Sequence, residues 1–137
     1  SHTRSQGYRA LLEGVAYSLR HSLEMLEGTG VKVKRIIATG GGTRNRLWTQ
    51  IVSDVVGKDQ EIAVQPFGSP YGDAFMAGYG VGIFKDVSPL RTGWAPETSR
   101  VEHNPETKRV YDKYYAAYRG LYERNKDHMH ALAELSL

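Results

Sequence analysis

The chain has 137 residues, a formal net charge of +3 and no cysteine. The length favours a single domain, and the missing cysteine excludes disulfides, thiolate catalysis and thiolate-bound metals. The basic residues are scattered, so the charge does not predict nucleic-acid binding. No apolar run reaches the ~20 residues of a membrane span, and no signal segment opens the chain. We therefore expect a soluble, cytoplasmic protein with no nucleic-acid or membrane partner.

A long helix is the first predicted element. Apolar residues recur at steps of three and four, which places them on one helix face: Tyr8, Leu11, Leu12, Val15, Ala16, Leu19, Leu23 and Leu26. Thr3 and Gln6 have the spacing of a capping box, and Ser5 is the alternative N-cap. Glycines at positions 28 and 30 predict the end of the helix.

A strand–helix–strand unit follows. Residues 35–39 are short, apolar and partly β-branched, which is typical of a strand buried on both faces. A loop over 40–45 leads to a helix over 47–56, which Gly57 ends, and residues 61–65 form the next strand. Because such crossovers are right-handed, we expect the two strands to be parallel neighbours.

The second half of the chain is predicted to be mainly helical. A helix rich in glycine and alanine runs from about Tyr71 to Phe84, and residues 85–103 read as a loop. Asn104 and Pro105 predict the start of a last helix, whose regularly spaced tyrosines indicate packing against a neighbour. Two parallel strands do not cover their own edges, so the fold class is α/β and we expect part of the fold to lie outside this chain.

The glycine run Gly40-Gly41-Gly42 is the strongest local signal for ligand binding. Glycines between a strand and a helix expose backbone N–H groups that bind phosphate, but they are equally typical of a tight turn. A P-loop needs lysine and then serine or threonine after the glycines, and Arg44-Asn45 stand there instead. A dinucleotide fingerprint needs a third glycine where Asn45 lies and an acidic residue at the end of the second strand. Both familiar motifs are therefore excluded.

The sequence around this loop resembles a known family. Residues 36–57, IIATGGGTRNRLWTQIVSDVVG, are similar to the adenosine-side motif of the FGGY carbohydrate kinases, the family of xylulokinase, ribulokinase and glycerol kinase. Residues 8–14 resemble the preceding helix of that family, and residues 71–77 resemble its late small-residue helix. The tyrosine pattern between Pro105 and Tyr122 is like that of the xylulokinase branch. The four matches keep their order and cover nearly the whole chain.

The resemblance implies a fold, a cofactor and a binding site. Members have the actin-like ATPase fold, with two ribonuclease-H-like domains around ATP and its Mg²⁺, and this chain corresponds to a truncated C-terminal domain over residues 1–137. Gly40, Gly41 and Gly42 would lie along the phosphates. Thr43, which stands where many members have alanine, adjoins them, and Asn45 would approach the adenine. The small-residue helix would pack near the nucleotide.

The resemblance also implies what the chain lacks. The catalytic base of the family is an aspartate of the N-terminal domain, which no segment here resembles, so no catalytic or metal-ligating residue is predicted in this chain. The whole enzyme would transfer the γ-phosphoryl group of ATP to a sugar hydroxyl, with a xylulose-like pentulose favoured and held through the missing N-terminal domain. The fragment alone should be inactive. The alternatives are a non-catalytic nucleotide-binding module and a self-associating domain that forms a homodimer.

Two carboxylates near these motifs are interpreted as structural. Asp73 lies near the start of the small-residue helix, where an acidic residue stabilises the helix dipole. Asp54 belongs to a helix that already has an apolar face, so it is either solvent-facing or structural.

Overall fold

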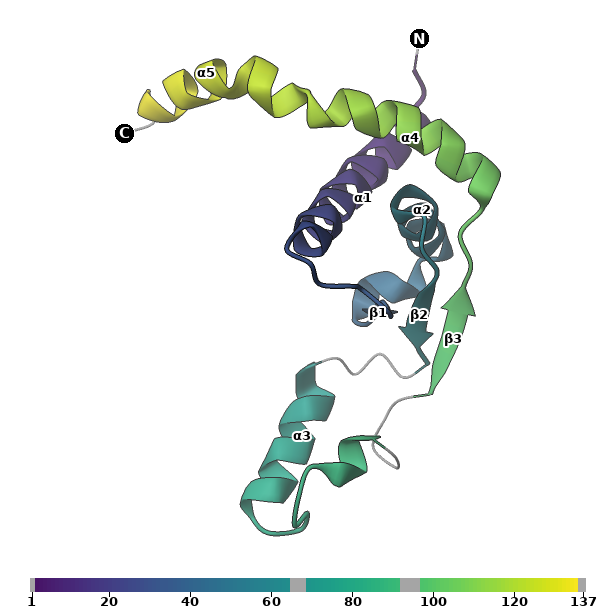
Figure 1. The fold of residues 1–137 in the computed structure, drawn as a ribbon, viewed down its shortest axis with the longest axis vertical. Coiled ribbons are helices and arrows are strands. Elements are labelled where there is room, and N and C mark those ends of the chain that lie inside the picture. Colours follow the sequence, from purple (N-terminus) through teal and green to yellow (C-terminus); the bar gives the residue numbers. More distant parts are fainter. Residues whose placement is uncertain (1, 65–68, 92–96, 136–137) are drawn as a thin grey trace.

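The computed structural model describes residues 2–64, 69–91 and 97–135. Its elements in chain order are α1 (Arg4–Gly28), β1 (Ile37–Ala38), the 3₁₀ helix η1 (Gly41–Arg44), α2 (Arg46–Val56), β2 (Gln60–Ala63), α3 (Ser69–Gly80), the 3₁₀ helix η2 (Ser88–Arg91), β3 (Thr98–Val101), α4 (Pro105–Arg119) and α5 (Leu121–Glu134). Helices α1, α2 and α4 gather at one end beside the sheet, and α3 lies at the other end (Figure 1). No helix of the described residues combines the length and apolar character needed to cross a membrane.

The sheet has three strands in the order β1-β2-β3. Strands β1 and β2 are parallel, with Ile37 opposite Glu61, and α2 forms the crossover between them. This confirms the predicted strand–helix–strand unit. Strand β3 runs antiparallel to β2, with Gln60 opposite Val101. It lies inside residues 85–103, so the prediction of a continuous loop there was wrong.

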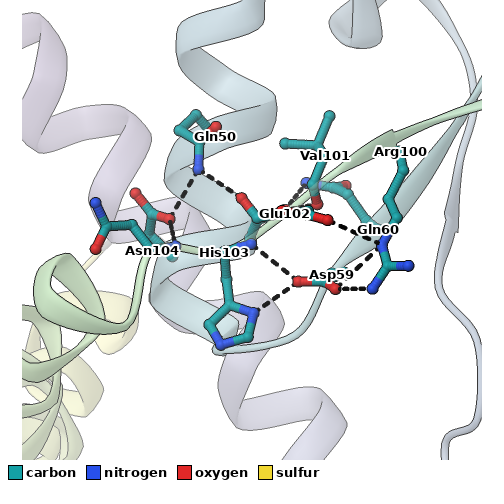
Figure 2. A network of polar contacts seen from close by, with 10 residues as sticks. Gln50, Asp59, Gln60, Arg100, Val101, Glu102, His103 and Asn104 are labelled. Carbon is teal, nitrogen blue, oxygen red and sulfur yellow. Dashed lines mark hydrogen bonds and ion pairs between the residues drawn. The ribbon is translucent and has the colours of Figure 1, made fainter.

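Polar side chains, and not an apolar pattern, hold residues 101–104 at the end of β3 and just after it. Four successive residues, 101 to 104, each bond through a backbone group to a side chain of α2 or of the turn after it (Figure 2): Ser53 Oγ to Val101 O at 3.2 Å, Gln50 Nε2 to Glu102 O at 2.9 Å, His103 N to Asp59 Oδ1 at 3.0 Å, and Asn104 N to Asp54 Oδ1 at 2.7 Å. We call these four contacts the polar clamp. Asp54 is buried, which confirms the structural alternative for this carboxylate.

The core lies where α1, α2 and α4 meet. Its buried members are Ala16, Tyr17, Ile51, Val55, Tyr111 and Tyr115. The rings of Tyr17 and Tyr111 meet edge to face with centroids 6.1 Å apart, a favoured aromatic geometry. The tyrosines of α4 at positions 111, 115 and 118 therefore pack against the neighbouring helices, as their spacing predicted.

Arg20 joins all three helices of the core. Its guanidinium donates to the backbone oxygen of Val55 in α2 at 3.1 Å and to Asp112 of α4 at 2.7 Å. It also bonds Glu24 on its own helix at 3.0 Å and lies 4.1 Å from the ring centroid of Tyr115. Because only 15% of this side chain is exposed, these contacts are poorly screened by water.

Local caps set the helix ends largely where the sequence placed them. Thr3 and Gln6 form the capping box of α1, and Asn104 caps α4 just before Pro105. Gly57 ends α2 in the left-handed region, at φ 68°, which favours glycine. The last helix differs from the prediction because it divides at Gly120 into α4 and α5, and α5 buries none of its residues.

Much apolar surface stays uncovered within the described part of the chain. On α1, Leu11 is 72% exposed and Val15 is 55% exposed, although the helical pattern placed both on the apolar face. Ile37 of β1 is 45% exposed, so the prediction of a strand buried on both faces was wrong for this chain. A cleft of about 390 Å³ between α1, β1 and α2 is lined largely by leucine, isoleucine and valine side chains and by Trp48.

Candidate functional site

The glycine loop begins at the carboxyl end of β1. Gly40 has φ 90° and ψ −179°, a conformation that is essentially restricted to glycine. The chain then forms η1 where an irregular loop was predicted, and Thr43 N donates to Gly40 O at 3.2 Å. Asn45 lies between η1 and α2 and is the C-cap of the first and the N-cap of the second. Ligands of α/β sheets bind beyond the carboxyl ends of parallel strands, which is where this loop lies.

Two successive backbone donors of the loop are free. Within the described residues, the N–H groups of Gly41 and Gly42 donate to no protein acceptor. A Cβ atom at Gly41 would meet open space, and one at Gly42 would lie 3.4 Å from Trp48 Nε1. Adjacent unpaired N–H groups form a concave donor set that suits an anion. The loop therefore offers backbone donors that suit a phosphate group. The glycine run in the sequence did not decide between such a loop and a tight turn.

The side chains of the other two predicted residues are used within the loop. Thr43 Oγ1 donates its single proton to Gly40 O at 2.7 Å. Asn45 is the N-cap of α2, and its Oδ1 accepts from Leu47 N at 3.0 Å and from Trp48 N at 3.3 Å. Thr43 and the Asn45 oxygen thus stabilise the loop conformation. Among the described residues, the groups that remain for a ligand include the two glycine N–H groups and the Asn45 amide nitrogen.

Tyr8 is a neighbour of the site that sequence analysis did not find. Asn45 Nδ2 donates to Tyr8 Oη at 3.5 Å, across 37 positions of sequence. In the sequence, Tyr8 is one of the regularly spaced apolar residues of the first helix and part of the segment 8–14 that resembles the family. Neither pattern indicates that α1 starts beside the loop. Its proximity depends on the packing of α1 against α2 (Figure 1).

Two arginines add positive charge beside the free donors. Arg44 lies in the last turn of η1 and Arg46 in the first turn of α2, and both are exposed. Neither has a carboxylate partner within 4.0 Å among the described residues. Such unpaired cations raise the local concentration of anionic ligands. The described residues hold no group of three or more His, Asp or Glu side chains that could bind a metal ion.

Helix α3, which was expected near the nucleotide, follows the carboxyl end of β2. In Figure 1 it lies below the sheet, at the end opposite to α1 and α4. Its buried residues are Phe75 and Gly78, and Phe75 stacks on Phe84 from the following loop with centroids 4.7 Å apart. Asp73 is exposed on this helix.

The charged groups at the amino end of β2 have a structural role. Arg35 bonds Glu61 through two contacts of 2.6 Å, and Thr98 adds a third, so the pKa of Glu61 falls to about 2. Arg100 and then His103 hold the pKa of Asp59 well below its usual range. These contacts fasten the strands to each other, and they lie at the opposite end of the parallel pair from the glycine loop.

The parallel pair and its crossover helix define an α/β unit with a glycine loop and free backbone donors at the carboxyl end of β1. The model of the FGGY family of carbohydrate kinases, C-terminal domain, matches residues 1–81. The chain therefore belongs to the FGGY family of carbohydrate kinases.

Individual relatives match more of the chain than the family model does. A xylulose kinase of Staphylococcus epidermidis is 30% identical over 125 residues, which are 91% of this chain and 25% of that protein. The crystal structure of xylulose kinase from Rhodospirillum rubrum superposes with a TM-score of 0.79 at 34% identity, and the match covers 95% of this chain and 26% of that one. A Plasmodium falciparum glycerol kinase solved with ADP shares the fold, with a TM-score of 0.63 at 23% identity over 82% of this chain and 24% of that one.

These neighbours confirm the expected fold class, the actin-like ATPase fold of the sugar kinases, represented here by a small sheet and several helices. The chain spans about a quarter of the length of the curated relatives it matches. Because the match to this xylulose kinase covers 91% of the chain, it extends beyond residue 81, where the family model ends.

Proposed function

We propose that this chain is the nucleotide-binding part of an ATP-dependent carbohydrate kinase, and that the loop from Gly40 to Asn45 binds the nucleotide. The observation that carries the proposal is the pair of free N–H groups at Gly41 and Gly42, in a chain of this kinase family. The Plasmodium falciparum relative, which shares the fold, was solved with ADP.

The residues of the loop fit the phosphates of ATP. Backbone donors bind phosphate oxygens without a side chain, and the open space at Gly41 permits close approach. Arg44 and Arg46, which are exposed and adjoin the loop in sequence, add positive charge to this part of the chain. Mg²⁺ would arrive bound to the phosphates, as is usual for nucleotide sites, where protein carboxylates provide few of its ligands.

The proposed reaction is transfer of the γ-phosphoryl group of ATP to a sugar hydroxyl, the reaction type of EC 2.7.1. In such transfers a protein contributes mainly positioning and charge stabilisation. This chain would fix the nucleotide, while the catalytic base and the sugar pocket belong to an N-terminal domain. We favour a xylulose-like pentulose as substrate because several relatives matched over most of this chain, including those of Staphylococcus epidermidis and Rhodospirillum rubrum, are xylulose kinases. By itself the chain should phosphorylate no sugar.

The Gly41→Val substitution tests the proposed site. The added side chain enters open space, so folding should be preserved, but it fills the volume that a phosphate would occupy. ATP affinity measured by titration calorimetry should fall at least tenfold. Gly28→Val is the matched control, because that glycine also faces open space and lies at the far end of α1. Equal ATP affinity in both variants would refute the site.

The exposed apolar face of α1 favours one alternative function, self-association. Leu11, Val15, Leu19 and Leu26 are each at least 41% exposed, and apolar surface of this kind commonly marks an interface. Light scattering with and without ATP separates the two functions. A stable homodimer that does not respond to ATP would favour an interaction module over a nucleotide-binding one.

A further inference from the structure

Trp48 is the third residue of α2, and one edge of its indole ring faces the glycine loop. A Cβ atom at Gly42 would lie 3.4 Å from Trp48 Nε1 and 3.5 Å from Trp48 Cδ1, so the edge of the ring that carries the N–H group lies beside Gly42. Trp48 also packs against the helical core and lines the apolar cleft. The ring therefore joins the loop to the core, with its polar edge at the loop.

The indole N–H group of Trp48 has no acceptor among the described residues. The backbone N–H of Trp48 donates to the Asn45 side chain, but the Trp48 side chain forms no hydrogen bond with any described residue. Within the described part of the chain, no buried side-chain nitrogen or oxygen lacks a partner, so the unpaired Nε1 atom of this half-buried residue reaches solvent. Indole N–H groups usually have a partner where they are buried, and this one is accessible to a ligand.

Trp48 Nε1 lies close enough to the loop donors to share a ligand with them. In glycine the backbone nitrogen is about 2.5 Å from the position of a Cβ atom, so Trp48 Nε1 is within about 6 Å of Gly42 N. Two donors that each lie about 2.9 Å from one oxygen can be separated by up to about 6 Å, and a phosphate group offers several oxygens. The indole donor can therefore act together with the free N–H groups of Gly41 and Gly42.

We propose that the indole N–H group of Trp48 is a further donor of the phosphate site and bonds an oxygen of the phosphate chain of the nucleotide. This inference rests on the proposed nucleotide site. A phosphate oxygen carries negative charge, so a hydrogen bond that it accepts is stronger than one between neutral groups. Gly42 suits this arrangement, because a larger side chain there would cover the N–H edge of the indole ring.

Nuclear magnetic resonance of the ¹⁵N-labelled chain tests the contact directly. The chain has two tryptophans, and sequential assignment identifies the indole signal of Trp48. We expect ATP to move this signal downfield, and inorganic tripolyphosphate, which has phosphate oxygens and no base, to do the same. The amide signals of Gly41 and Gly42 report that each ligand has bound. An indole signal that moves with ATP but not with bound tripolyphosphate would assign Trp48 to the base or the ribose, which overturns the proposal.

The Trp48→Phe substitution measures how much the donor contributes. Phenylalanine keeps an aromatic ring for packing and removes the N–H group. ATP affinity, measured by titration calorimetry on chain that circular dichroism shows to be folded, should fall about tenfold, the effect of one hydrogen bond to a charged group. Tyr122→Phe is the control, because it removes an exposed donor from α5, which extends away from the sheet (Figure 1). Equal ATP affinity in the two variants would overturn the proposal.

The same spectra separate this inference from the proposed function. If ATP moves the amide signals of Gly41 and Gly42 but leaves the indole signal of Trp48 in place, the nucleotide site stands and the inference fails. If ATP moves none of the three signals, the proposed function fails together with the inference.

Discussion

The helical core and the α3 region are stabilised in different ways. In the core, α1, α2 and α4 share six buried residues, and Arg20 bonds to all three helices. In residues 69–91, the buried residues are Phe75 and Gly78, and Phe75 stacks on Phe84. Regions with few buried contacts open at lower free energy. The comparison indicates that the glycine loop stands on a rigid support, while α3 beyond it is the more easily displaced part.

The largest effect is expected from Ile51→Ala in the core. Ile51 is 1% exposed, and such truncations cost about 2–5 kcal/mol through lost burial and the remaining cavity. The free energy of unfolding, measured by urea titration of circular dichroism, should fall by about 3 kcal/mol. A loss below about 1 kcal/mol would mean that the three helices are not the main source of stability.

Arg20→Ala should have the next largest effect. It removes charge-assisted hydrogen bonds between helices, each of which contributes about 1.5–3 kcal/mol, although Lys108 still pairs with Asp112 and Arg119 with Glu24. We expect a loss of about 2 kcal/mol.

Lys126→Ala is the control for Arg20→Ala, because Lys126 pairs with Glu123 on its own helix, α5, and is 41% exposed. It should cost less than about 1 kcal/mol. Equal losses in the two variants would contradict the bridging role of Arg20.

Acid should weaken the sheet through Glu61 of β2. Its pKa is lowered from 4.5 to about 2 by Arg35 and Thr98, so the folded protein binds this proton less readily than the unfolded chain does. The stabilisation is present above pH 4.5 and is lost as the pH falls toward 2. Glu61→Gln should therefore flatten the decline of the urea midpoint between pH 4.5 and 2. An unchanged decline would show that other carboxylates control it.

Phe75→Ala should have the smallest effect on global stability. Phe75 is 1% exposed, as Ile51 is, but its ring stacks on a neighbour within the α3 region. We expect the free energy of unfolding to fall by less than about 1 kcal/mol, while amide hydrogen exchange of residues 69–80 becomes faster. A global loss as large as that of Ile51→Ala would remove the distinction between the two regions.

The sequence was sufficient wherever a local chemical pattern sets the structure. The capping box at Thr3, the cap at Asn104 and the end of α2 at Gly57 were all predicted, because each depends on residues within one or two turns. The parallel pair with α2 between its strands followed from hydrophobic pattern and the handedness rule. The residues alone located the glycine loop and excluded two familiar phosphate-binding motifs, the P-loop and the dinucleotide fingerprint.

Tertiary structure decided the features that depend on distant partners. Strand β3 has a polar sequence, Thr98 to Val101. The chain at its end is held by the polar clamp, whose side chains come from residues 44 to 52 positions earlier. The contact of Tyr8 with Asn45 likewise depends on how α1 packs. The directions of the Thr43 hydroxyl and the Asn45 amide follow from bonds within the folded loop. Residue types and spacing thus indicated the proposed site, but only the folded backbone determined which of its polar atoms remain free for a ligand.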